Sequence, residues 1–94
     1  MYKRQTQDVS LVVEDAVPAG DVLDAFVSGA GPLLEAIELV DDYRGAGLQQ
    51  GTKSLTFGLR FRAPDRTLTA AEATAAKQAG VTVTTERLGA HLRE

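Results

Sequence analysis

The sequence predicts an α+β domain in which two helices cover one face of a four-stranded antiparallel sheet. The chain has 94 residues, enough for one domain. Its predicted elements follow the order strand, helix, strand, strand, helix, strand. Residues 52–62 alternate apolar and polar side chains along their whole length, which is typical of a strand buried on one side only.

The first two elements are a strand over residues 8–14 and a helix after Pro18. The strand is rich in β-branched residues, and the apolar side chains on one of its faces are Val9, Leu11 and Val13. Proline suits the first turn of a helix. Apolar residues at helical spacing follow, namely Val22, Leu23, Phe26 and Val27. We expect this helix to end at Gly29 and Gly31, since Pro32 forbids its continuation.

Two strands are predicted next, over residues 33–43 and 52–62. Neither parity of the earlier strand is cleanly apolar, so we expect it to be bulged or apolar on both sides. A loop with three glycines, residues 44–51, joins the two. In the later strand the apolar face is Leu55, Phe57, Leu59 and Phe61. Its opposite face is Ser54, Thr56, Gly58, Arg60 and Arg62.

The second helix begins after Thr69, which has Glu72 three residues on, the spacing of a capping box. Gly80 and the β-branched residues of "GVTVTT" disfavour helix. We nevertheless expect helix to about Leu88, because a strand there would leave too little helix to cover the sheet. The ending "AHLRE" predicts a short edge strand. This order is the ferredoxin-like arrangement, βαββαβ, over one domain of residues 1–94 with residues 1–7 as a leader or chain end.

One face of such a sheet is left open. It would present the even residues of 52–62 together with Ser10, Val12 and Glu14. Gly58 would allow a flat group to approach the backbone closely. Tyr43, near the end of the second strand, suits stacking with an unpaired base. The alternative is that these serines and threonines are ordinary solvent-facing residues and that Tyr43 packs on a loop.

Charge is unevenly distributed along the chain. The net charge is −3, which argues weakly against nucleic acid as a partner. Residues 8–42 hold nine acids and no Lys or Arg, whereas residues 43–64 hold four basic residues and no acid. This segregation favours either a two-sided electrostatic field or ordinary solvated faces.

Several kinds of chemistry are excluded by composition. Cysteine is absent, so there are no disulfides or thiolate metal sites. His91 is the single histidine, and nothing completes a metal site or a Ser–His–acid arrangement. No apolar run is long enough for a membrane helix, and the start is not a secretory signal, so a cytoplasmic setting is the default. We therefore expect that the chain by itself is not a catalyst.

Four segments carry a family resemblance: "DVSLVV", "GPLLEAIELVDDYRG", "GTKSLTFGLRFRAPDRTLT" and "GAHLR". Over residues 8–93 they resemble the ferredoxin-fold anticodon-binding domain that closes the β subunit of bacterial phenylalanyl-tRNA synthetase. The resemblance implies that this domain holds the anticodon stem–loop of tRNA(Phe) and was excised from a longer chain. It implies no cofactor in the domain, while the parent enzyme uses ATP and magnesium. The other implied partners are the rest of the β subunit and the α subunit, with no membrane.

The resemblance also implies site residues. A base would stack on Tyr43 and bond Asp41, both in the motif "DDYRG". The remaining residues carried over are Ser54 of "KS", Ser10 of the first strand and Arg93 of "HLR". Further RNA-binding candidates are Arg44, Arg60 and Arg62, of which the last two would serve the phosphate backbone or hold acidic neighbours.

Two other function classes stay open at the level of sequence. A ferredoxin-like module that binds a protein or a small ligand, without an RNA role, is favoured by the acidic first half, since a fold does not fix a function. A free-standing enzyme is disfavoured because no catalytic constellation is visible.

Overall fold

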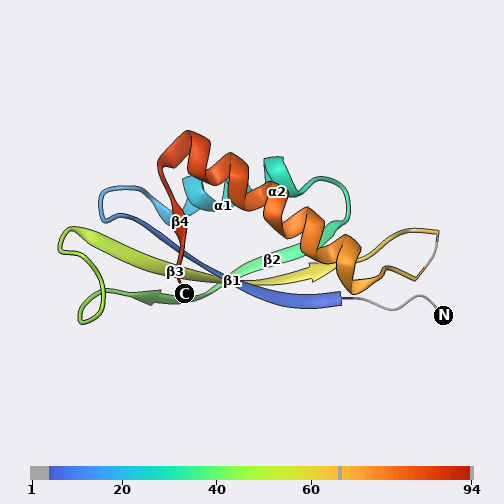
Figure 1. Ribbon diagram of the computed structural model, residues 1–94, viewed down its shortest axis with the longest axis horizontal. Helices are drawn as coiled ribbons and strands as arrows, with labels where there is room; N and C mark the ends of the chain where they lie inside the picture. Colours follow the sequence, from blue (N-terminus) through green and yellow to red (C-terminus); the bar gives the residue numbers. More distant parts are fainter. Residues whose placement is uncertain (1–4, 66, 94) are drawn as a thin grey trace.

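The computed structural model describes residues 5–65 and 67–93. Its elements follow the predicted order (Figure 1): β1 (Gln5–Glu14), α1 (Ala19–Ala30), β2 (Leu34–Tyr43), β3 (Thr52–Phe61), α2 (Ala70–Leu88) and β4 (His91–Leu92). The strands form one sheet in the order β2-β3-β1-β4, with every pairing antiparallel. The α+β, ferredoxin-like fold class is therefore confirmed.

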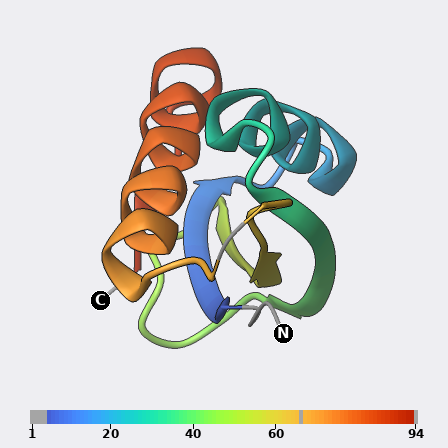
Figure 2. The same ribbon diagram turned by 90° about the vertical axis from the view of Figure 1, so that its right-hand side faces the viewer.

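Both helices lie on the same side of the sheet, which leaves the other side uncovered (Figures 1 and 2). The core fills the space between the two layers. Its largest fully buried apolar side chains are Phe26, Phe57, Phe61, Leu11, Leu55, Leu68 and Val22. β3 supplies three of these from its odd-numbered positions, so the alternation in the sequence separates the buried face from the open one.

The two helices cross at a pair of glycines. A Cβ built on Gly29 would lie 2.6 Å from the carbonyl oxygen of Ala79, and one on Gly80 would lie 2.9 Å from the ring of Phe26. Hydrogen is thus the largest side chain that fits at either position. Gly80 costs helix propensity locally, but it allows the helices to approach closely over a fully buried ring.

The end of α1 differs from the prediction. Gly29 stays inside the helix, which runs on to Ala30 and ends at Gly31, whose φ of 79° suits a glycine C-cap. The expectation that Gly29 ends the helix was wrong, because this residue is needed at the crossing with α2. Pro18 is the N-cap residue, one position before the first turn.

The remaining boundaries agree closely with expectation. β1 begins at Gln5, three residues before the predicted start. α2 runs unbroken to Leu88 and opens with a capping box, in which the backbone N–H of Glu72 donates to Thr69 Oγ1 over 3.2 Å. The hydroxyl of the buried Thr84 donates to the carbonyl oxygen of Gly80 over 2.8 Å, so this polar group is satisfied within the helix.

The close crossing of α1 and α2 predicts that a glycine-to-alanine substitution inside a helix is destabilising. Gly80→Ala should lower the free energy of unfolding by about 1–3 kcal/mol, because the added Cβ overpacks the ring of Phe26. Helix propensity alone would change stability in the opposite direction, by about 1 kcal/mol. Urea denaturation measures the difference.

Gly20→Ala in α1 is the matched control, since no atom lies within 4 Å of its Cβ position. It should leave stability unchanged or raise it. Equal stability of the two variants would contradict the close crossing.

Candidate nucleic-acid interface

Cross-strand pairing arranges the open face of the sheet in rows. Tyr43 pairs with Ser54, Ser54 pairs with Val12, and Val12 pairs with His91. We call these four residues the tyrosine row. The next row holds Asp41, which pairs with Thr56, and Ser10, which also pairs with Thr56.

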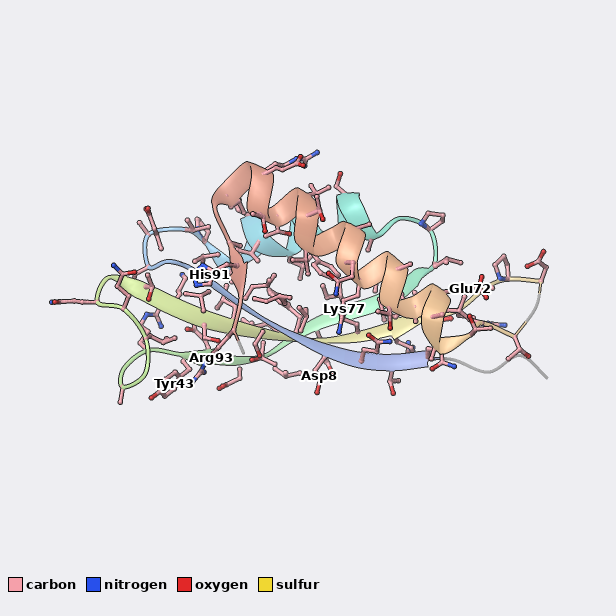
Figure 3. The ribbon with its side chains drawn as sticks, in the orientation of Figure 1. Asp8, Tyr43, Glu72, Lys77, His91 and Arg93 are labelled. Carbon is pink, nitrogen blue, oxygen red and sulfur yellow. The ribbon has the colours of Figure 1, made fainter. Side chains whose placement is uncertain are left out.

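Arg93 completes this second row, because its backbone N–H donates to the carbonyl oxygen of Ser10 over 3.0 Å. We call Asp41, Thr56, Ser10 and Arg93 the aspartate row. The rows are adjacent, since their members on β1 and β3 are two residues apart. Figure 3 shows Tyr43 and Arg93 on the side of the sheet away from the helices.

A β-bulge aims Asp41 and Tyr43 at this face. Ile37 and Leu39 are odd-numbered, like Asp41 and Tyr43. They nevertheless pair with Leu59 and Phe57, on the helix side of the sheet. The register shifts between Leu39 and Asp41, so residues after the bulge point the other way. The prediction of a bulged second strand is confirmed.

The ring of Tyr43 is fixed from two directions. Its hydroxyl donates to the carbonyl oxygen of Ala46 over 2.7 Å, and the guanidinium carbon of Arg93 lies 5.0 Å from the ring centroid. This distance is within the range of a cation–π interaction. Arg93 follows β4 and Tyr43 ends β2, so the two side chains meet above the intervening strands β1 and β3.

Two side chains beneath this contact are buried although they belong to the open face. Val12 is 5% exposed and Ser54 is 1% exposed. In the tyrosine row they lie on the two central strands, between Tyr43 on β2 and His91 on β4. Within residues 5–65 and 67–93, Ser54 Oγ is the buried side-chain polar atom that has no hydrogen-bond partner. In contrast, Ser10 Oγ and Thr56 Oγ1 share a hydrogen bond of 2.7 Å.

The arginines of β3 and its end lie elsewhere. Arg60 Nε contacts Glu35 Oε1 at 2.8 Å, and Arg62 Nη1 lies 3.5 Å from Glu35 Oε2. Arg60 is four residues from Thr56 along β3, or about 13 Å. The structure thus places both arginines at the end of the sheet far from the tyrosine row, beside an acidic neighbour.

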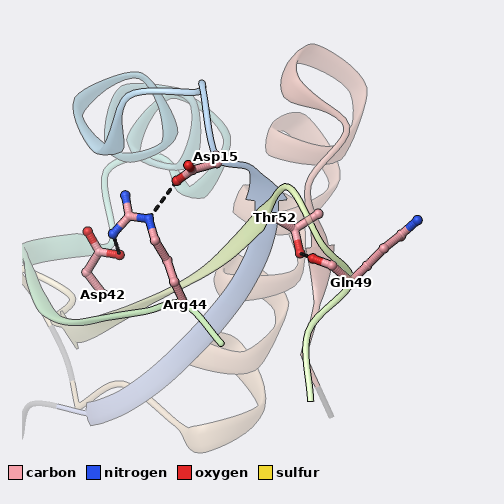
Figure 4. Close-up of polar contacts among 5 residues, drawn as sticks. All are labelled: Asp15, Asp42, Arg44, Gln49 and Thr52. Atoms are coloured by element: carbon pink, nitrogen blue, oxygen red, sulfur yellow. Dashed lines mark hydrogen bonds and ion pairs between the residues drawn. The ribbon is translucent and has the colours of Figure 1, made fainter. Parts of the chain in front are cut away.

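Arg44 also pairs with acids (Figure 4). Its Nε contacts Asp15 Oδ1 at 2.6 Å and its Nη1 contacts Asp42 Oδ1 at 2.9 Å, which joins the loop after β2 to the loop after β1. The hydrogen bond from Arg44 lowers the pKa of Asp15, and the same bond raises the pKa of Arg44. Both side chains are solvent-exposed, so the pair should be sensitive to salt.

The described residues contain no group of three or more His, Asp or Glu side chains that could hold a metal ion. Among the described helices, none is both long and apolar enough to cross a membrane.

Comparison with known proteins identifies the family. Residues 1–93 match the family described as the ferredoxin-fold anticodon binding domain. The chain belongs to this family. The resemblance stated from the sequence is confirmed.

Similar sequences occur in much longer proteins. The chain is 66% identical over 93 residues to the phenylalanine–tRNA ligase beta subunit of Leifsonia xyli subsp. xyli, covering 99% of this chain and 11% of that one. It is 58% identical over 87 residues to the subunit of the same name from Mycobacterium leprae, covering 93% of this chain and 10% of the relative. The anticodon-binding domain therefore spans about a tenth of the length of these relatives.

Within this domain, the rows unite five of the eight candidate residues: Asp41, Tyr43, Ser10, Ser54 and Arg93. Sequence reasoning did not single out Thr56 for the site, although it bridges Asp41 and Ser10. Its parity with Ser54 was the signal that could have found it.

The two serines of the interface predict opposite stability changes. Ser54→Ala should raise the free energy of unfolding by about 1 kcal/mol, because it removes a buried hydroxyl that has no partner. Ser10→Ala should lower it by about 0.5–1.5 kcal/mol, because the hydrogen bond to Thr56 is lost. Urea denaturation of both variants tests the assignment, and a clear loss of stability in Ser54→Ala would contradict it.

The Asp15–Arg44 pair predicts a titration shift. Because the folded-state pKa of Asp15 is lowered, its stabilising contribution is present above the ordinary pKa and is lost as pH falls through the folded value. Arg44→Ala should raise the pKa of Asp15 toward the ordinary value, as measured by carboxyl NMR titration. Arg60→Ala, which breaks the contacts with Glu35, should leave that pKa unchanged, and a shift there would point to another cause.

Proposed function

We propose that the domain binds the anticodon stem–loop of tRNA(Phe) on its open face, as a part of a phenylalanine–tRNA ligase β subunit. One observation carries the proposal: the tyrosine and aspartate rows bring an aromatic ring, a carboxylate, the hydroxyls of Ser10 and Thr56 and a guanidinium onto one helix-free surface. Stacking platforms with adjacent hydrogen-bonding groups are the usual means of reading unpaired bases. The similarity to β subunits supports the same role.

The contact between Arg93 and Tyr43 suggests how a base enters. An unpaired base takes the place of the guanidinium on the ring, since both use the same π-face. Arg93 is then free to contact a phosphate or the base itself. Its departure uncovers the unpaired hydroxyl of Ser54, which gains a hydrogen-bond partner in the bound state.

Asp41 determines which hydrogen-bonding groups of a base the site can recognise. It is exposed beside Thr56, and an ionised carboxylate only accepts hydrogen bonds. It therefore selects base edges that donate N–H groups. Ser10 and Thr56 exchange one hydrogen bond between them and keep further donor and acceptor capacity for the ligand.

The activity of a whole ligase would belong to other parts of a longer protein. Aminoacylation with ATP and magnesium would take place in the catalytic body, formed with an α subunit, in the cytoplasm. This domain would contribute tRNA binding. With net charge −3 and few arginines beside the rows, we expect modest affinity that falls as salt rises.

A tyrosine substitution tests the proposal. Tyr43→Ala should weaken binding of a phenylalanine anticodon stem–loop about 5- to 150-fold, the loss expected for one stacked base. Tyr43→Phe should bind nearly as well as the wild type, because the ring remains. Fluorescence anisotropy at fixed ionic strength measures both.

Arg93→Ala and Arg87→Ala provide a charge-matched pair, since Arg87 lies on α2, on the helix side. The first should weaken binding and the second should not. Equal affinity of wild type, Tyr43→Ala and Arg93→Ala would overturn the proposal. Binding of a protein partner instead of RNA would favour the alternative module.

A further inference from the structure

A hollow in the open face lies directly beside the aspartate row. Here Asp8 and Glu38 both pair with Gly58, on either side of it. Thr6 and Arg60 close the end of the hollow farthest from Tyr43. Figure 3 shows Asp8 on the same side of the sheet as Tyr43 and Arg93. None of the residues predicted for anticodon binding, apart from Arg60, belongs to this hollow.

Gly58 is not required by the fold. A Cβ built on it would meet Val40 Cγ1 at 3.5 Å, Asp8 Oδ1 at 3.8 Å and Glu38 Cγ at 3.8 Å, all ordinary contacts. Its φ is not in the positive range that favours glycine. Glycine inside a strand costs about 0.5–1 kcal/mol relative to alanine. A glycine inside a strand can mark a site where another molecule approaches the backbone closely.

The surroundings of Gly58 fit a nucleobase. Val40, the extra residue of the β2 bulge, is 52% exposed and forms an apolar wall within contact distance of the Gly58 position. The exposed carboxylates of Asp8 and Glu38 can accept hydrogen bonds from a base edge. The same two charges would repel a phosphate group, so the occupant is a base and not the RNA backbone.

We propose that this hollow is a second nucleobase subsite, which takes the base next to the one stacked on Tyr43. This inference rests on the proposed function. Gly58 is two residues from Thr56 along β3, about 7 Å, so one RNA strand passes from the aspartate row to the hollow. The base lies flat over Gly58 against Val40 and donates N–H groups to Asp8 or Glu38. Arg60, which is paired with Glu35, lies at the far end of the hollow.

A double-mutant cycle between protein and RNA tests the subsite. The probes are the phenylalanine anticodon stem–loop and a set of its versions with a single abasic loop position. Gly58→Ala should weaken binding of the intact stem–loop about 10-fold, because its methyl group lifts the base off the backbone. One of the abasic stem–loops should lack the base that occupies the hollow. Gly58→Ala should not weaken the binding of that stem–loop any further. A neighbouring abasic position should couple in the same way to Tyr43→Ala.

Folding is controlled separately. Gly58→Ala should unfold at the same or higher urea concentration as the wild type, and Gly20→Ala should bind every RNA as the wild type does. Glu38→Gln, which keeps the shape and removes the charge, should weaken binding of the intact stem–loop more than that of the critical abasic one.

Two results would overturn the subsite: unchanged binding of all RNAs by Gly58→Ala, or an equal loss on every abasic version. Either result, with a normal Tyr43→Ala effect, leaves the proposed function standing. Loss of the Tyr43→Ala effect would instead remove the proposed function.

Discussion

The strict alternation of β3 is the constraint on which the rest of the structure depends. This strand pairs with both β1 and β2, so its odd residues build the core under the helices and its even residues supply the middle of the open face. A slip of one residue would exchange these faces completely. The burial of Leu55, Phe57 and Phe61 opposes such a slip, because it would move all three side chains to the open face. The same interaction that stabilises the domain therefore also places Ser54, Thr56 and Gly58 on the open face.

Gly80 and Gly58 show two different roles of glycine in this structure. Gly80 is demanded by the fold, since the ring of Phe26 occupies the space where its side chain would be. Gly58 has room for a methyl group and lies on the open face. Packing accounts for Gly80, whereas the glycine at position 58 is one of the observations behind the proposed base subsite. Elsewhere on the open face, the guanidinium of Arg93 lies 5.0 Å from the centroid of the Tyr43 ring.

The sequence predicted the fold well because its strongest signals are local. The alternation of residues 52–62 predicted β3 to within one residue. The Thr69–Glu72 capping box predicted the start of α2, and the helix length needed to cover the sheet predicted its end. The position of the bulge and the partners of side chains across strands could not be predicted from local patterns. The bulge that turns Tyr43 to the open face depends on its partner strand, and the pairing of Arg60 with Glu35 joins residues 25 positions apart. Composition alone could not separate arginines held by acids from Arg93, which lies on an aromatic ring.

We propose above all that RNA binds the helix-free face of the sheet across the tyrosine and aspartate rows. NMR mapping of the isotope-labelled chain, titrated with the phenylalanine anticodon stem–loop, tests it most directly. We expect amide shifts to concentrate at Ser10, Thr56 and Tyr43 and to continue to Gly58. Shifts concentrated on α1 and α2, with the open face unchanged, would contradict it.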